Sequence, residues 1–128
     1  MKKQIVFAPI VVLVIAFGAF AQTKVDVRFA RGASATTVHG AVSGYKYVDY
    51  RLGARGGQMM SVRITTPSPY ASFVIFDGQM QNVEGAAEQT DWSGELPSDG
   101  TYTIRVLLPR SAARRGTSAT YSLRISIH

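Results

Sequence analysis

Short runs of alternating apolar and polar residues, separated by turns rich in glycine and proline, are the feature that most constrains this chain. The clearest run is the last one, in which Tyr121, Leu123, Ile125 and Ile127 alternate with polar residues. Successive side chains of a strand point to opposite faces, so this period indicates a strand with one buried face. The predicted strands cover residues 25–29, 36–42, 45–52, 60–65, 72–76, 92–96, 101–108 and 121–128. About eight short strands without a long helix predict an all-β fold, an antiparallel β-sandwich.

Two segments depart from this alternation. Residues 72–76 are apolar at four of their five positions, which predicts a strand that is buried on both faces. Residues 79–90 are the least regular part of the chain. A short helix from Val83 to Gln89 is the only helical element that this region suggests.

The pairing of strands 36–42 and 45–52 is open at the level of sequence. A two-residue turn at Ser43-Gly44 would place Val38 opposite Asp49 on one face of the sheet. Periodicity, however, points Val38 and Val48 towards the core. Either a bulge intervenes, or the two strands belong to different sheets.

The N-terminus has the features of a secretory signal. Met1-Lys2-Lys3 is basic, the following residues to Phe20 are uncharged, and Ala19-Phe20-Ala21 fits a signal-peptidase site. We therefore predict a signal peptide over residues 1–21 and a single exported domain over 22–128, without a stable membrane anchor after cleavage. The alternative is an uncleaved anchor, because the apolar run is close to the length that spans a bilayer. The chain contains no cysteine, so it forms no disulfide.

The positive net charge favours an anionic partner but does not identify its class. The formal net charge is +6, and Lys2 and Lys3 lie in the predicted signal, so residues 22–128 carry +4. Ten of their twelve basic residues are arginine, whose planar guanidinium suits carboxylate and phosphate groups. Anionic envelope polymers, nucleic acid and an acidic protein cleft would all match this charge.

The segment Ser43-Gly44-Tyr45-Lys46-Tyr47-Val48-Asp49-Tyr50 is the first candidate binding surface. Alternation directs inward Val48, Tyr50 and Leu52. It places on the solvent face Tyr45, Tyr47, Asp49 and Arg51. Exposed aromatic side chains beside charges indicate binding, although tyrosine also occurs on ordinary sheet faces.

The second candidate is the basic loop over residues 109–118, which contains Arg110, Arg114 and Arg115. It joins two strands that we expect to be hairpin neighbours, and it is longer than the two to five residues that a hairpin needs. The loop is either a solvated basic segment or an arginine-bearing finger that reaches an anionic partner.

Catalysis is not indicated. The two histidines lack the spacing of metal ligands, so no metal or other cofactor is expected. A triad of Ser43, His39 and Asp49 can be written down, but nothing resembles a nucleophile elbow. Glu84 and Glu88 lie in a polar loop without flanking aromatics, which does not suit a glycosidase pair.

Three stretches together resemble the bacterial periplasmic inhibitors of goose-type (g-type) lysozyme. They are Ser43 to Tyr50, Leu96-Pro97-Ser98-Asp99-Gly100-Thr101-Tyr102-Thr103-Ile104-Arg105-Val106, and Ser111-Ala112-Ala113-Arg114-Arg115. The resemblance extends over roughly residues 25–127. The stretch at 96–106 is also similar to the broader group of prepeptidase C-terminal-like, or jelly-roll, sandwiches, so it bears on the fold alone.

The resemblance implies a periplasmic protein that obstructs the substrate cleft of g-type lysozyme as a protein partner, with neither nucleic acid nor a cofactor. Matched by position, the lysozyme-binding residues would be Ser43, Gly44, Tyr47 and Arg115, with Tyr45 and Arg114 as additional candidates. The alternative is a sandwich module that binds envelope polysaccharide or another protein without inhibiting an enzyme.

Overall fold

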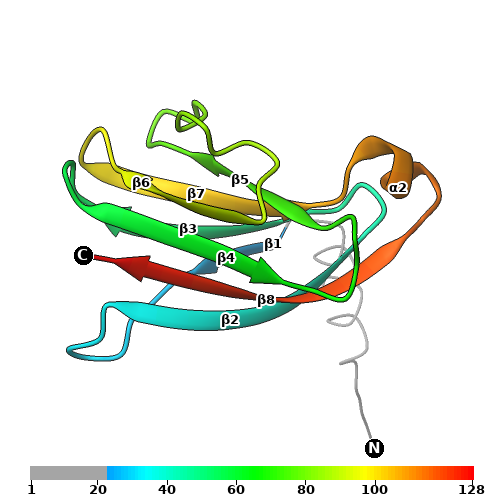
Figure 1. The fold of residues 1–128 in the computed structure, drawn as a ribbon, viewed down its shortest axis with the longest axis horizontal. Coiled ribbons are helices and arrows are strands. Elements are labelled where there is room, and N and C mark those ends of the chain that lie inside the picture. Colours follow the sequence, from blue (N-terminus) through cyan, green and yellow to red (C-terminus); the bar gives the residue numbers. More distant parts are fainter. Residues whose placement is uncertain (1–22) are drawn as a thin grey trace, which may run out of the picture.

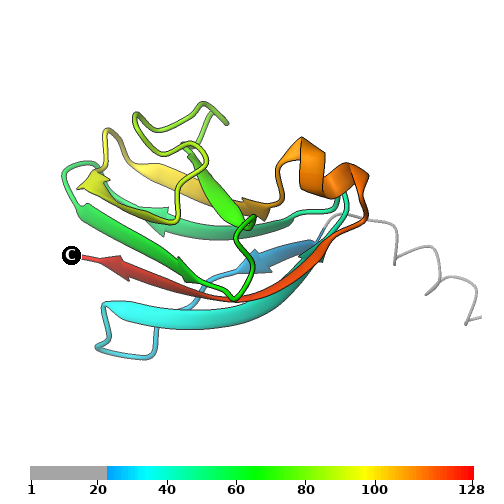
Figure 2. The ribbon, with the colours of Figure 1, turned by 45° about the vertical axis from the view of Figure 1, so that its right-hand side comes forward.

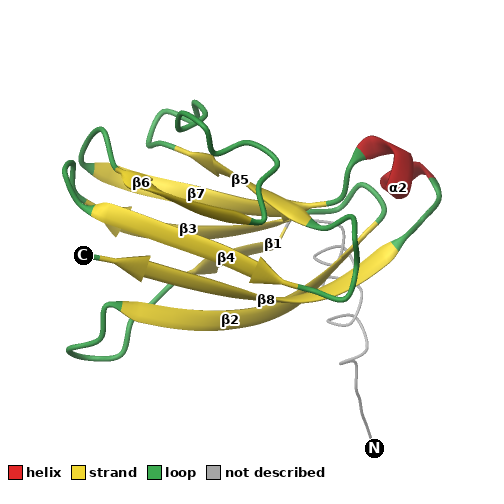
Figure 3. Ribbon diagram, in the orientation of Figure 1, coloured by secondary structure: helices red, strands yellow, loops and turns green. Residues whose placement is uncertain are grey.

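The computed structural model describes residues 23–128, so the predicted signal peptide at 1–21 lies outside the described residues. Eight strands and one short helix follow each other within these described residues (Figures 1 and 3). Their bounds are β1 Thr23–Asp26, β2 Ala35–Ser43, β3 Val48–Ala54, β4 Met59–Thr65, β5 Ser72–Phe76, β6 Asp91–Glu95, β7 Gly100–Leu107, α2 Arg110–Arg114 and β8 Ser118–Ile127. Within residues 23–128, no helix is long and apolar enough to cross a membrane.

The strands form two four-stranded sheets that pack face to face (Figure 1). We call them sheet A, with strand order β1-β3-β7-β5, and sheet B, with order β2-β8-β4-β6. All pairings are antiparallel except that of β1 with β3. The predicted β-sandwich of about eight strands is therefore confirmed.

Alternation along the long strands builds the core between the sheets. In β8, Tyr121, Leu123, Ile125 and Ile127 are buried, as the sequence pattern predicts. In β7 the buried apolar residues include Tyr102, Ile104 and Val106, which lie towards the same core. Burying these side chains removes apolar surface from water, which is the main stabilising contribution in a chain without disulfides.

A pair of tyrosines connects the two sheets. The hydroxyls of Tyr50 in β3 and Tyr121 in β8 are 2.6 Å apart, and the rings meet edge to face with centroids 6.4 Å apart. Gly40 in β2 provides the room, because a Cβ atom there would lie 2.6 Å from the Tyr121 hydroxyl and 2.8 Å from that of Tyr50. Each buried hydroxyl thus finds its hydrogen-bond partner in the opposite sheet.

The open question about β2 and β3 is resolved by topology. The two strands belong to different sheets, so Val38 and Asp49 are not cross-strand partners. The predicted strand over 45–52 is wrong at its start, because a turn closed by the Lys46 N–H donating to the Ser43 carbonyl delays β3 until Val48. The first strand likewise covers Thr23–Asp26 in place of 25–29.

The predicted helix from Val83 to Gln89 is wrong. Gly85 has φ of +75° and Glu88 has φ of +53°, and both values are incompatible with a right-handed helix. The segment instead runs along the open edge of β5, where amide and carbonyl groups of β5 bond to Val83, Ala86 and Gln89. This covering satisfies an edge that would otherwise be free to pair with another chain.

β5 itself differs from the prediction that both its faces are buried. Phe73 and Ile75 are fully buried against the core, whereas Ser72, Val74 and Phe76 are only half-buried. The strand lies at the edge of sheet A, where no second layer covers its outer face.

Candidate functional site

Three connections meet at one end of the sandwich, which we call the loop end: residues 44–47, 66–71 and 108–117 (Figure 1). Strand register fixes this arrangement. In sheet B, Ser43 at the end of β2 pairs with Ser118 at the start of β8, so the segments next to these residues lie at the same end. On sheet A, Val48 lies opposite Val106, and Leu107 opposite Ser72. Figure 2 shows α2 beside the turn between β2 and β3 from a second direction.

The Ser43-Gly44 turn rests directly on the basic segment. Gly44 adopts φ of +58°, in the left-handed region that favours glycine. Its N–H donates to the carbonyl of Thr117 over 2.9 Å, and a Cβ atom at this position would lie 3.9 Å from the Ala113 carbonyl oxygen. The turn at Ser43-Gly44 and the basic loop over residues 109–118 are therefore in contact, although about 70 residues separate them.

The basic segment contains a short helix that the sequence did not predict. α2 begins at Arg110 after Pro109, and its Ala112 and Ala113 are buried beneath the loop end. The expected hairpin is also wrong, because β7 belongs to sheet A and β8 to sheet B, so the segment crosses between the sheets. This crossing explains why the connection is longer than a hairpin requires.

Arg114 and Arg115 are exposed at the C-terminal end of α2. The Arg115 guanidinium donates from Nη1 to the Ser111 carbonyl over 3.1 Å. Its central carbon lies 5.3 Å from the centroid of the Tyr70 ring, within the range of a cation–π contact. Tyr70 is an exposed residue, and its position after Pro69 carries no sequence signal of a binding role.

The loop end is strongly basic. Its segments contain no acidic residue, and its exposed cations are Lys46, Arg110, Arg114 and Arg115. Within residues 23–128 the ion pairs join Arg51, Arg63 and Arg105 to aspartates, and all three arginines lie on the strands. The positive charge of the loop end is thus not neutralised by the fold, which suits an anionic partner.

The two tyrosines of the first candidate surface lie in different environments. Tyr45 is 65% exposed at the tip of the turn, in a shallow hollow lined by Ser43, Gly44, Lys46 and Gly116. Tyr47 is half-buried, and its ring stacks on Arg105. The prediction that Asp49 faces solvent beside them is wrong, because this aspartate is only 4% exposed and is paired with Arg105.

The triad considered for catalysis is not formed. His39 Nδ1 lies 3.2 Å from the hydroxyl of Ser122, and Asp49 is bound to Arg105, so the Ser43, His39 and Asp49 triad is absent. Among residues 23–128, no group of three histidine or acidic side chains could hold a metal ion.

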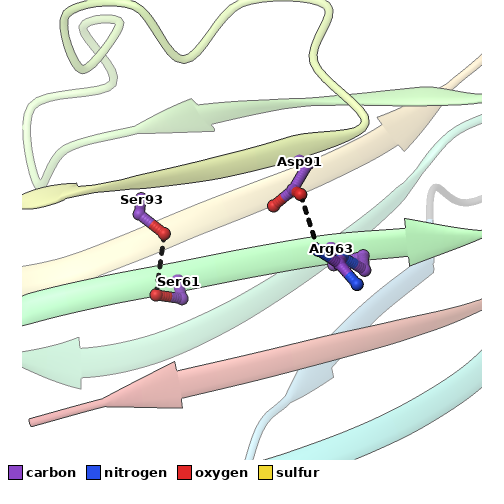
Figure 4. A network of polar contacts seen from close by, with 4 residues as sticks. All are labelled: Ser61, Arg63, Asp91 and Ser93. Carbon is purple, nitrogen blue, oxygen red and sulfur yellow. Dashed lines mark hydrogen bonds and ion pairs between the residues drawn. The ribbon is translucent and has the colours of Figure 1, made fainter.

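A second polar surface covers the outer face of sheet B (Figure 4). There the Arg63 guanidinium pairs with the Asp91 carboxylate at 2.8 Å, and the hydroxyls of Ser61 and Ser93 are 2.9 Å apart. These cross-strand pairs satisfy each other. This face therefore offers a partner less unpaired charge than the loop end does.

Comparison with known proteins places this geometry in a family. No protein-family model matches the chain. The inhibitor of g-type lysozyme from Escherichia coli K12 is 30% identical over 108 residues, which cover 81% of this chain and 80% of that protein. The chain belongs to the family of g-type lysozyme inhibitors. This membership confirms the resemblance read from the sequence.

Solved structures agree with the family assignment. The crystal structure of PliG from Aeromonas hydrophila, a periplasmic inhibitor of g-type lysozyme, matches with a TM-score of 0.73 at 38% identity. The match covers 83% of this chain and 96% of that inhibitor. The descriptions of such relatives confirm the predicted periplasmic location. These relatives are described as inhibitors of g-type lysozyme.

The broader fold assignment is also confirmed. The pre-peptidase C-terminal domain of a Bacillus anthracis collagenase matches with a TM-score of 0.51 at 10% identity, over 84% of this chain and 95% of that domain. At this level of identity the match concerns the architecture of the sandwich alone.

Proposed function

We propose that this protein inhibits a g-type lysozyme by inserting its loop end into the cleft that binds peptidoglycan. Family membership supports the class of target. The observation that carries the mode of action is the 2.9 Å hydrogen bond from Gly44 to Thr117, which holds the Ser43-Gly44 turn against the basic loop that contains Arg114 and Arg115.

Arginine chemistry explains how such a surface would stop the enzyme. A glycosidase of this type needs a carboxylic acid in its cleft to protonate the glycosidic oxygen. A guanidinium from Arg114 or Arg115 beside that acid forms a charge-assisted hydrogen bond and lowers the pKa of the acid. The carboxylate then no longer donates a proton, and the inserted loop excludes the sugar.

The turn and the tyrosines would supply shape and contact area. Ser43 and Gly44 are small, so the backbone at the turn can approach the walls of a cleft closely. Tyr45 projects from the turn, and Tyr47 presents one face of a ring that is already stacked. Tyrosine buries a large area at low cost in side-chain entropy, which is why it is frequent among interface hot spots.

A lysis assay tests the proposed function. The protein, purified from the periplasm of an expressing host, is titrated against g-type lysozyme with peptidoglycan as the substrate. We expect clearing to stop near an equimolar ratio. Undiminished clearing at a large molar excess of the protein would refute inhibition of that enzyme.

Variants test the assigned residues. Arg115→Ala and Tyr47→Ala should each weaken inhibition by at least ~2 kcal/mol if these residues are hot spots. The matched control is Arg55→Ala, which removes an exposed arginine from the connection between β3 and β4 at the opposite end of the sandwich (Figure 1). This control should inhibit like the wild type. Full inhibition by both test variants would show that the interface lies elsewhere.

A further inference from the structure

Arg105 occupies an unusual position beside the first candidate surface. It lies on β7, and its guanidinium carbon is 3.9 Å from the centroid of the Tyr47 ring. The same carbon is 5.1 Å from the centroid of Phe76 on β5, so the cation contacts two aromatic rings. Both distances are within the range of cation–π attraction.

A buried carboxylate fixes the plane of this guanidinium. Asp49 is the cross-strand partner of Arg105, and its two carboxylate oxygens accept from Nε at 2.8 Å and from Nη2 at 3.0 Å. Such a bidentate pair defines an orientation as well as a distance. The hydrogen bond to Asp49, reinforced by its charge, raises the pKa of Arg105, so the side chain remains a cation.

Tyr47 lies in the connection between the turn at Gly44 and Val48, the first residue of β3. A tyrosine on such a segment would lose rotamer freedom on binding, which weakens an interface. Stacking on a fixed guanidinium removes this freedom before the partner arrives.

We propose that Arg105 is a positioning residue, which holds the Tyr47 ring in the orientation in which it meets the lysozyme. This inference rests on the proposed function, and it adds a residue that lies behind the interface. Arg105 acts through Tyr47. Asp49 holds the Arg105 guanidinium through the bidentate pair, and the Phe76 ring contacts the same guanidinium.

A double-mutant cycle tests this role. Arg105→Lys keeps the positive charge but loses the planar fork that both Asp49 and the Tyr47 ring require. We expect this variant to inhibit about two- to tenfold more weakly, the cost of ordering one side chain. In a Tyr47→Ala background the same substitution should have no further effect, because no ring remains to be positioned.

The control is Arg63→Lys. Arg63 also pairs with an aspartate across strands, but on the outer face of sheet B (Figure 4). The Arg63→Lys variant should inhibit as strongly as the wild type. A second readout uses the free protein: Arg105→Lys should shift the NMR signals of the Tyr47 ring and reduce its nuclear Overhauser contacts with residue 105, while the ring signals of Tyr45 stay in place.

The outcomes distinguish the positioning role of Arg105 from the proposed inhibition of g-type lysozyme. Two results would overturn the positioning role alone. In the first, Arg105→Lys inhibits as strongly as the wild type. In the second, Arg105→Lys weakens inhibition by the same factor in the Tyr47 and Tyr47→Ala backgrounds. Failure of the wild type to inhibit any g-type lysozyme would overturn the proposed function and this role with it. Thermal denaturation shows whether Arg105→Lys loses inhibition because it unfolds. If it does, the NMR signals of the Tyr47 ring in the folded fraction decide whether Arg105 positions that ring.

Discussion

At the scale of single residues, the hydrogen bond between Tyr50 and Tyr121 connects the two sheets through their core. Replacing either residue by phenylalanine leaves the other hydroxyl buried without a partner, which costs about 1–3 kcal/mol. Replacing both removes the unpaired group, so the double variant should lose clearly less stability than the sum of the single variants. Denaturant unfolding of the three variants measures this. Strict additivity would show that the hydroxyls do not interact.

The same pair predicts a dependence of stability on pH. Burial raises the pKa of both Tyr50 and Tyr121 above the ordinary value of 10.0. Above that pH the unfolded chain releases protons that the folded protein retains, so the free energy of unfolding falls as pH rises. Below it the contribution of the pair is fully present. Unfolding measured between pH 8 and about 11 should show this loss in the wild type.

The matched control for this pH effect is the double phenylalanine variant, which has no titrating group at either position. Its stability should fall less over the same range of pH. An equal fall in both proteins would assign the effect to other groups.

At the scale of elements, the segment along the edge of β5 depends on the left-handed conformation of Gly85. Gly85→Ala should destabilise the protein by about 1–2 kcal/mol. The cost comes from the backbone, because the new Cβ would meet its nearest neighbour, Trp92 Nε1, at an ordinary 3.7 Å. Amide hydrogen exchange should accelerate at Phe73 and Ile75, which donate to this segment.

Gly53→Ala is the control for this prediction. Gly53 lies within β3, and a Cβ atom there would meet nothing within 4 Å. The free energy of unfolding of the Gly53→Ala variant should be unchanged or slightly raised. Unaltered exchange at the edge of β5 in Gly85→Ala would contradict the role assigned to the covering segment.

Sequence patterns predict individual strands much better than they predict how strands pair. The alternation in β7 and β8 identifies both strands and their buried faces. It contains no information on the crossing between sheets at α2, because a helix of five residues is too short to show a period. The late start of β3 at Val48 depends on a hydrogen bond within the turn, from Lys46 to Ser43, which no periodicity reveals.

At the scale of the whole molecule, the candidate site combines segments that are distant in sequence. Composition and periodicity selected Tyr45, Tyr47 and the arginine loop separately, and only the family resemblance combined them. The contact between Gly44 and Thr117 shows where the fold joins these segments. Arg105 was not selected, because an arginine on the outer face of a strand is ordinary until its cross-strand partner is known.

An NMR titration of the labelled protein with g-type lysozyme tests most directly whether the loop end is the inhibitory surface. We expect the amide signals of residues 43–47 and 110–117 to change in proportion to the bound fraction. Signals from the outer face of sheet B, at Ser61, Arg63 and Ser93, should remain in place (Figure 4). Perturbation confined to that face, or no perturbation at an equimolar ratio, would contradict insertion of the loop end into the lysozyme cleft.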